Sequence, residues 1–211
     1  MSTLKVDTIL KRTGTGTITV GQSGDTVALP SVTLTTALPV AQGGTGGTSF
    51  SAAGLANTPM FDAYLSADAT FSDASATKIQ FNTETIDTDS AYDNSSNFRF
   101  TVPSGEAGKY LIYGSAVFGT DTASGNGAGA LLLYKNGAVF ASAGVTNHNA
   151  NNPERESQFL SQIYDLSVGD YLEFYVYCDT TGSGAKLYAA SAGSGSYSSQ
   201  ACRFGGHKLI G

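Results

Sequence analysis

Strand and turn signals alternate from Met60 to the C-terminus, and this pattern constrains the fold more than any other feature. Runs of β-branched and aromatic residues favour strands, while the Gly, Asn and Ser clusters between them favour turns. No amphipathic helical pattern interrupts the series, which is typical of an all-β sandwich. We expect ten strands, near Met60–Leu65, Lys78–Asn82, Phe98–Val102, Lys109–Phe118, Ala130–Lys135, Ala138–Gly144, Gln158–Leu166, Tyr171–Cys178, Lys186–Ala190 and Arg203–Ile210.

The sharpest local signal is Asn136-Gly137, which stands between two apolar runs. Both residue types tolerate a positive φ, as a two-residue hairpin turn requires. We therefore expect a tight hairpin with a well-defined register at this point.

Several expected strands carry apolar or aromatic residues on both faces. In Tyr171–Cys178 the period of two places four apolar side chains on one face and three tyrosines with Glu173 on the other. A strand in a monomeric sandwich normally shows water a polar face, so the second face predicts a buried contact between chains. We expect Tyr113, Tyr175 and Tyr177 at a homotrimer interface; the alternative is a ladder of exposed tyrosines on a monomer.

The first part of the chain has a different character. Residues 1–57 are rich in Thr, Gly, Val and Ser and cannot close a core alone, so we expect an extended β-rich shaft or attachment segment formed by three chains. A disordered linker is the alternative. Glycines in Leu38–Thr48 predict a hinge, and residues 58–211 are expected to form the folded head.

Charge and hydropathy exclude several classes of partner. The formal charge is −6, from 11 Lys and Arg against 17 Asp and Glu, and no basic run could neutralise a nucleic-acid backbone. No apolar run reaches the roughly 18 to 20 residues that a membrane-spanning helix needs. The start of the chain also lacks the apolar core of a secretory signal, so we expect neither membrane insertion nor export by that route.

Residues with catalytic or metal-binding chemistry are few. His148 and His207 stand outside any zinc-protease spacing, and no nucleophile-elbow motif occurs. The acidic run Asp87–Asn94 lacks the central Gly and terminal Glu of a calcium loop, so a solvated loop is favoured over a bound cation. We expect no catalytic residue, no cofactor and no metal ligand, although a carboxylate pair for glycan cleavage stays open as an alternative.

The two cysteines, Cys178 and Cys202, fall in or beside expected strands and lack metal-ligand spacing. We expect two free, buried thiols.

Recognition is expected in the polar loops of the head. Gly, Ser and Asn are frequent in four stretches there, at residues 121–127, 147–152, 180–184 and 194–199. Binding residues commonly lie on such loops above a rigid β scaffold. Amide and hydroxyl groups suit sugar hydroxyls, and a tyrosine ring suits a sugar's apolar face. The candidate ligand-binding residues are Asn126, Asn147, His148, Asn149, Asn151, Ser196 and Tyr197.

The head resembles the TNF-like jelly-roll family, which includes the globular heads of complement and collagen-type proteins. Five stations occur in order, at Phe98–Pro103, Gly108–Ile112, Leu131–Gly137, Leu166–Leu172 and Phe204–Leu209. The resemblance implies two sheets and a threefold homotrimer. In the last station, His207 replaces an aromatic residue often found there.

The N-terminal part resembles bacteriophage tail-fibre openings and shafts through Leu4–Ile9, Gly14–Val20 and Val40–Gly46. That resemblance implies an N-terminal end docked to another virion protein and a head that faces outward. We therefore expect a trimeric phage fibre or appendage protein on the tail or capsid surface, assembled in the host cytoplasm, whose head binds a host-surface carbohydrate or protein. Alternatives are a trimeric structural virion protein (capsid decoration, cement or baseplate component) and a glycan depolymerase.

Overall fold

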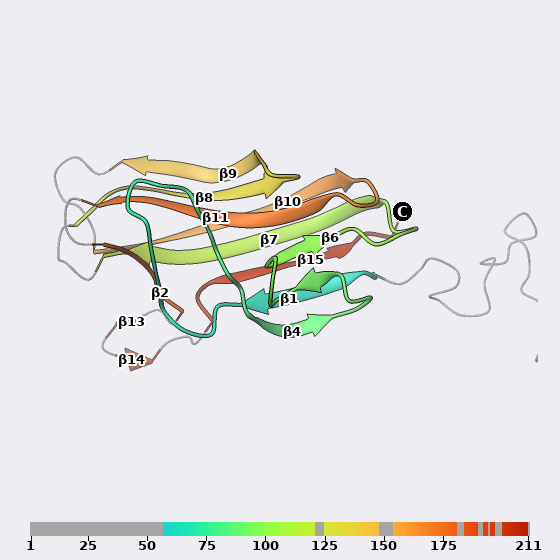
Figure 1. Cartoon of the computed structure of the whole chain (residues 1–211), viewed down its shortest axis with the longest axis horizontal. Helices are drawn as coiled ribbons and strands as arrows, with labels where there is room; N and C mark the ends of the chain where they lie inside the picture. Colours follow the sequence, from blue (N-terminus) through green and yellow to red (C-terminus); the bar gives the residue numbers. More distant parts are fainter. Residues whose placement is uncertain are drawn as a thin grey trace, which may run out of the picture. The chain divides into compact units, whose positions relative to one another are not determined.

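The computed structural model describes residues 57–120, 125–147, 154–180, 184–189, 192–193, 195–196 and 200–210 (Figure 1). These residues form strands, turns and loops without a helix, so none of the described chain provides a helix that could cross a membrane. The expected all-β class is confirmed.

The first sheet is built around β7, which pairs along one edge with β10 and along the other with β15. From β15 the sheet continues to β1 and then β4, while β12 pairs with the end of β7 and carries β2. All these pairs are antiparallel. The strands are β1 (Met60–Tyr64), β2 (Ala69–Phe71), β4 (Thr83–Asp87), β7 (Gly108–Gly119), β10 (Arg155–Leu166), β12 (Ala185–Leu187) and β15 (Arg203–Lys208).

The second sheet has the order β5-β6-β11-β8-β9, with β3 also paired to β11. A small separate hairpin joins β13 and β14. The strands are β3 (Thr77–Lys78), β5 (Tyr92–Asp93), β6 (Arg99–Thr101), β8 (Asn126–Lys135), β9 (Ala138–Asn147), β11 (Tyr171–Thr180), β13 (Ala192–Gly193) and β14 (Gly195–Ser196).

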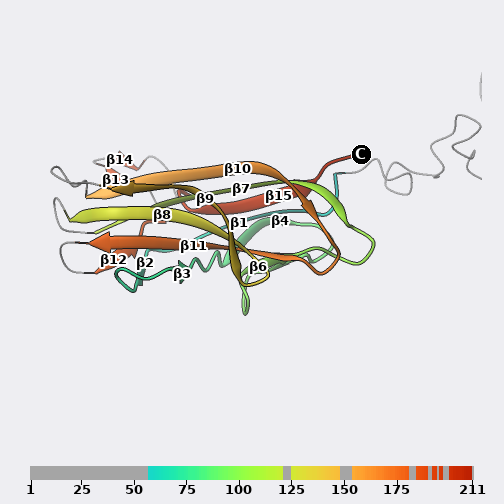
Figure 2. The same ribbon diagram turned by 90° about the horizontal axis from the view of Figure 1, so that it is seen from above.

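The chain passes repeatedly between the two layers. After β7 in the first sheet it forms β8 and β9 in the second, returns to the first for β10, forms β11 in the second and ends with β15 in the first (Figure 2). This alternation gives two facing four-stranded layers, β1-β15-β7-β10 and β6-β11-β8-β9, which is the order of a jelly roll. The predicted jelly-roll sandwich is therefore confirmed by the strand pairing itself.

Alternate residues of each long strand fill the space between the layers. Phe61 and Phe204 of the first sheet meet Phe100 and Phe174 of the second, with ring centroids 4.5 Å apart for Phe61–Phe100 and 4.9 Å for Phe174–Phe204. Gly114 on β7 is required here, because a Cβ would collide with the ring of Phe174. These aromatic contacts fix how the two sheets face each other.

The expected hairpin is confirmed. Asn136 and Gly137 connect β8 to β9 with φ values of 53° and 82°, the left-handed geometry that such a turn needs. The Asn136 side chain adds two hydrogen bonds, one donated to Asp170 Oδ1 at 2.7 Å and one accepted from the Tyr171 amide at 2.9 Å. The turn is thereby tied to the neighbouring strand β11.

Both cysteines are free and buried, as expected. Cys178 lies on β11 of the second sheet and Cys202 immediately precedes β15 of the first, so the two thiols belong to different sheets. Burial raises the pKa of Cys178 to about 12 and that of Cys202 to about 11.

Candidate interaction surfaces

The outer face of the first sheet gathers side chains from three adjacent strands. On β7 the even-numbered residues point into the core, so Tyr113 and Ser115 face outward. The register pairs Tyr113 with Gly205 of β15, and Gly205 in turn with Asp62 of β1. Residues paired across antiparallel strands share a face, so Tyr113 and Asp62 lie on the same side with one strand between them.

Gly205 allows these two side chains to meet. A Cβ at this position would collide with Tyr113 Oη, so only a glycine lets the tyrosine lie across β15. Tyr113 Oη then donates a hydrogen bond of 2.5 Å to Asp62 Oδ2. Burial, and next the hydrogen bond to the Asp62 carboxylate, raise the pKa of Tyr113.

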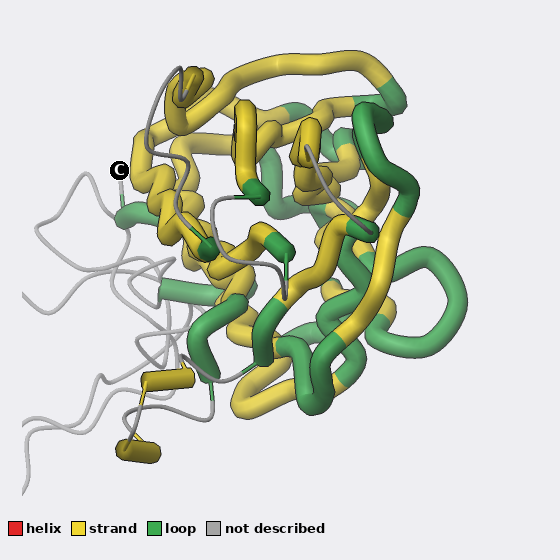
Figure 3. Tube along the Cα trace, turned by 90° about the vertical axis from the view of Figure 1, so that its left-hand side faces the viewer, coloured by secondary structure: helices red, strands yellow, loops and turns green. Residues whose placement is uncertain are grey.

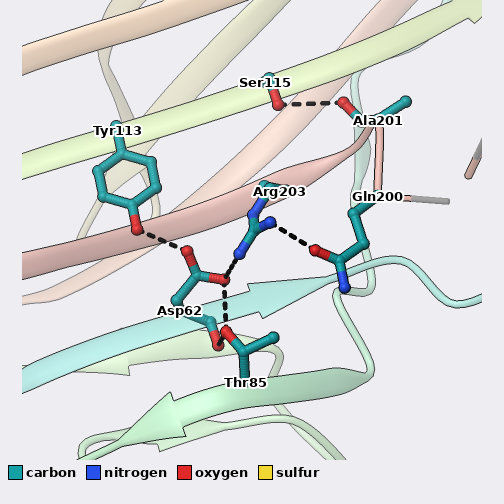
Figure 4. Close-up of polar contacts among 7 residues, drawn as sticks. All are labelled: Asp62, Thr85, Tyr113, Ser115, Gln200, Ala201 and Arg203. Atoms are coloured by element: carbon teal, nitrogen blue, oxygen red, sulfur yellow. Dashed lines mark hydrogen bonds and ion pairs between the residues drawn. The ribbon is translucent and has the colours of Figure 1, made fainter. Parts of the chain in front are cut away.

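Asp62 is the centre of a group of hydrogen-bonded polar side chains, which we call the Asp62 cluster (Figure 4). The cluster consists of Asp62, Thr85, Tyr113, Gln200 and Arg203. The residue is 7% exposed, and its Oδ1 accepts hydrogen bonds from Thr85 Oγ1 at 2.8 Å and Arg203 Nη2 at 2.5 Å. Arg203 Nη1 also donates to Gln200 Oε1. The carboxylate and guanidinium neutralise each other, so this face can lose water without leaving a buried charge unpaired.

A second surface is the apolar edge where β9 and β10 lie next to each other. Large hydrophobic side chains here are 44–69% exposed, and they comprise five of the eight such residues that the structure describes. Phe159 and Ile163 extend from the outer face of the first sheet, whereas Val139 and Val145 extend from that of the second. The exposed apolar groups therefore lie around one edge of the sandwich, as at a contact surface. We call this set the β9/β10 edge: Val139, Phe140, Val145, Phe159 and Ile163.

A third surface is the tyrosine-rich outer face of the second sheet. Tyr175 stacks on Tyr134 with ring centroids 4.0 Å apart, and the Arg99 guanidinium lies 4.3 Å from the Tyr171 ring centroid. Glu173 is 4% exposed and pairs with Lys78 at 2.6 Å. The rings are half-buried by one another, so the face is already packed within one chain.

The structure divides the three predicted interface residues between opposite faces of the sandwich. Tyr113 lies on the first sheet, whereas Tyr175 and Tyr177 lie on the second (Figure 3 views the two layers along their strands). All three point outward, as the period of two predicted. No single face of the described chain brings them together, and their place in an interface stays a prediction.

The predicted ligand-binding residues are also dispersed. Asn126 was expected in a loop; instead it begins β8 and is fully buried, donating from Nδ2 to Glu156 Oε2 at 3.3 Å and accepting from Cys178 Sγ at 3.2 Å. Asn147 is the exposed last residue of β9, and Ser196 ends β14. Four residues lie outside the described part: His148, Asn149, Asn151 and Tyr197.

The acidic run is used locally. The Asp87 carboxylate accepts hydrogen bonds from the amides of Ala91 and Tyr92, at 3.0 and 3.2 Å. Asp93 accepts bonds from the Ser96 and Ser95 amides, which lower its pKa. These carboxylates close turns, and the described residues contain no group of three or more His, Cys, Asp or Glu suited to a metal ion.

Sequence reasoning missed the Asp62 cluster. Asp62 and Arg203 are 141 residues apart and come together only because β1 pairs with the last long strand, β15. A charged residue at the centre of a short apolar strand was the available signal, but it carries no information about its partner.

Comparisons with known proteins give structural likeness only. No protein-family model matches the chain, and a search of curated proteins found no significant match. Among solved structures, murine APRIL at pH 8.0 is 13% identical with a TM-score of 0.47, covering 71% of this chain and 98% of that chain. The globular domain of zebrafish complement 1qA is 14% identical with a TM-score of 0.47, covering 72% and 98%. Because both TM-scores are below 0.5, the fold assignment rests on the strand order.

Proposed function

We propose that this chain is a trimeric, non-catalytic virion fibre or appendage protein of the phage type, whose head binds a host-surface receptor. The observation that carries the proposal is the β9/β10 edge, where exposed large hydrophobic residues are concentrated. A monomer would leave this edge in water at a cost of roughly 25 cal/mol per Å² of apolar surface. A partner chain that covers it removes this cost.

The contact we propose joins different surfaces of neighbouring copies. The β9/β10 edge of one chain packs on the outer face of the first sheet of the next, around the Asp62 cluster. That face is suitable because Asp62 already has three hydrogen-bond donors, so desolvation leaves no group without a partner. Head-to-tail contacts of this kind form either a closed ring or an open filament. We propose a closed ring of three copies because the sequence resembles the TNF-like jelly-roll family, for which a threefold homotrimer is expected.

Three ion pairs among the described residues contribute to a rigid scaffold of the kind that a binding head needs. Lys78–Glu173, Lys135–Asp170 and Arg203–Asp62 pair at 2.6, 2.7 and 2.5 Å. Partly buried pairs of this kind hold neighbouring strands and turns together. The proposed binding partner is a host carbohydrate or protein held by the head.

The virion role rests on the fibre-like motifs of the N-terminal residues. In this proposal they attach the trimer to another virion protein on the tail or capsid surface, after assembly in the host cytoplasm.

Two measurements on phage particles test the proposal. Gold-labelled antibody against residues 58–211 should decorate the free end of an appendage in electron micrographs, and purified full-length protein should compete with particles for host cells. Labelling spread over the capsid without competition for adsorption would identify a decoration protein and contradict the receptor-binding role.

A further inference from the structure

A cavity of about 300 Å³ lies beside the third surface, with which it shares Lys78. It lies between two short segments, one that contains β2 and one that begins with β3. β2 belongs to the first sheet through β12, and β3 belongs to the second through β11. The cavity therefore lies where the chain crosses between the layers, at the opposite side of the first sheet from β10.

One wall of the cavity is polar and regularly spaced. Lys78, Gln80 and Asn82 line it, while Ile79 and Phe81 between them are fully buried in the core. This alternation continues the extended backbone beyond β3, although only Thr77 and Lys78 pair as a strand. Three long polar side chains are thus presented on one side of a segment that the core holds in place.

These polar groups retain hydrogen-bonding capacity. The amide of Gln80 makes no bond within the described chain, and Asn82 uses Oδ1 to accept from the Ser66 amide at 3.1 Å, while its Nδ2 has no partner there. Lys78 Nζ donates to Glu173 at 2.6 Å and to the Asn97 carbonyl at 3.2 Å. An ammonium has three hydrogens, so one remains for a ligand.

The opposite wall supplies apolar surface and little net charge. The half-buried Phe71 supplies most of this apolar surface, because Leu65 and Leu187, which also line this side, are only 4% and 3% exposed. Asp68 also reaches the cavity, but its Oδ2 pairs with Lys186 at 3.2 Å and its Oδ1 accepts from the Ala189 amide at 2.9 Å. Lys78 is likewise neutralised by Glu173. The cavity therefore combines amides, an aromatic ring and balanced charges.

We propose that this cavity binds one ring of a neutral sugar. Amide groups both donate and accept, which matches hydroxyl groups that do the same, and the C–H face of a sugar ring suits Phe71. The volume is at the lower end of ligand pockets, about 300–1,000 Å³, so one ring fits better than a longer chain. The inference rests on the proposed receptor-binding function, for which it names a site and a ligand class.

The test uses the full-length protein on a printed array of neutral and acidic oligosaccharides, followed by titration of the strongest neutral glycan. Gln80→Ala and Asn82→Ala remove exposed amides without disturbing the core. Each should weaken binding about 3- to 10-fold, the effect of one lost hydrogen bond. Ser96→Ala removes an exposed hydroxyl outside the cavity and should bind as the parent does.

The outcomes separate this site from the wider function. Unchanged affinity in both amide variants would place the sugar elsewhere and overturn the cavity proposal while leaving receptor binding intact. Binding restricted to sialylated or uronic-acid glycans would also overturn it, as would a blank array from a protein that still adsorbs to host cells. A protein that binds neither glycans nor host cells would contradict the receptor-binding function itself.

Discussion

Asp62 shows how one residue can make the outer face of a sheet suitable for a contact. Its carboxylate is nearly buried, yet Tyr113, Thr85 and Arg203 satisfy it from three other strands or their ends. Hydrogen bonds to a charged group each contribute about 1.5–3 kcal/mol, more than neutral ones. The cluster should therefore matter to the stability of the head as well as to the surface it forms.

Asp62→Asn should lower the free energy of unfolding by about 2 kcal/mol, because the variant leaves the Arg203 guanidinium without its anionic partner. Urea denaturation followed by tyrosine fluorescence measures the change. Asp165→Asn is the matched control: it removes a carboxylate from the exposed pair with Lys109, whose side chains are 65% and 75% exposed for Lys109 and Asp165. Such pairs contribute at most about 1 kcal/mol. Equal effects in the two variants would contradict the structural role of Asp62.

The two thiols give a second prediction at the residue scale. Burial raises the pKa values of Cys178 and Cys202 to about 12 and about 11, so both stay protonated at pH 8. Since the thiolate is the reactive form, iodoacetamide should modify neither thiol in the folded protein and both after unfolding without reductant. The neutral thiols stabilise the fold below about pH 9, and this contribution is lost as the pH rises through the folded-state pKa values. Rapid modification of the native protein, detected by mass spectrometry, would argue that these strands are open.

At the scale of elements, the alternation of apolar and polar residues was sufficient to predict the long strands, and Asn136-Gly137 was sufficient to predict the β8–β9 hairpin. It was insufficient for β4, because Thr-Glu-Thr-Ile-Asp has too few apolar residues to be distinguished from a loop, and for the Gly- and Asn-rich start of β8. Alternation also identifies which residues face outward without naming the sheet, because pairing over long distances decides that. Tyr113 and Tyr175 therefore have the same sequence signature and lie on opposite faces.

Gly137→Ala tests the hairpin. The glycine has φ +82°, and an added Cβ would lie 3.3 Å from Tyr171 Oη. The substitution should destabilise the head by about 1 kcal/mol through backbone strain, visible as a lower melting temperature by differential scanning calorimetry. Ala138→Ser, at the exposed next residue, should leave the melting temperature nearly unchanged. A Gly137→Ala protein that melts with the parent would show that the turn adopts another geometry.

At the scale of the whole molecule, the all-β class of the head could be predicted from the sequence, whereas the apolar edge where β9 and β10 meet could not. Val139 and Phe140 lie in the apolar run that follows the hairpin turn, whereas Phe159 and Ile163 lie in a separate strand, and nothing in the sequence shows that the two strands share an edge. The candidate sugar cavity was hidden for another reason, because two segments from different sheets build it.

Phe159→Glu should dissociate the proposed trimer, because it places a charge where the neighbouring chain excludes water, at a cost of several kcal/mol. Phe159 is 62% exposed in the single chain, so the monomer itself should remain folded. Val168→Glu is the control, because Val168 is 51% exposed and lies outside the β9/β10 edge. Size-exclusion chromatography should show a smaller species for Phe159→Glu alone; a trimer in both variants would remove the edge from the interface.

The most direct test of the central claim is the mass of the full-length protein in solution. Sedimentation velocity at micromolar concentration should give a single species with three times the 21.7 kDa mass of the chain. A species of 21.7 kDa would show that the β9/β10 edge and the face around Asp62 stay uncovered, and it would contradict the trimeric account.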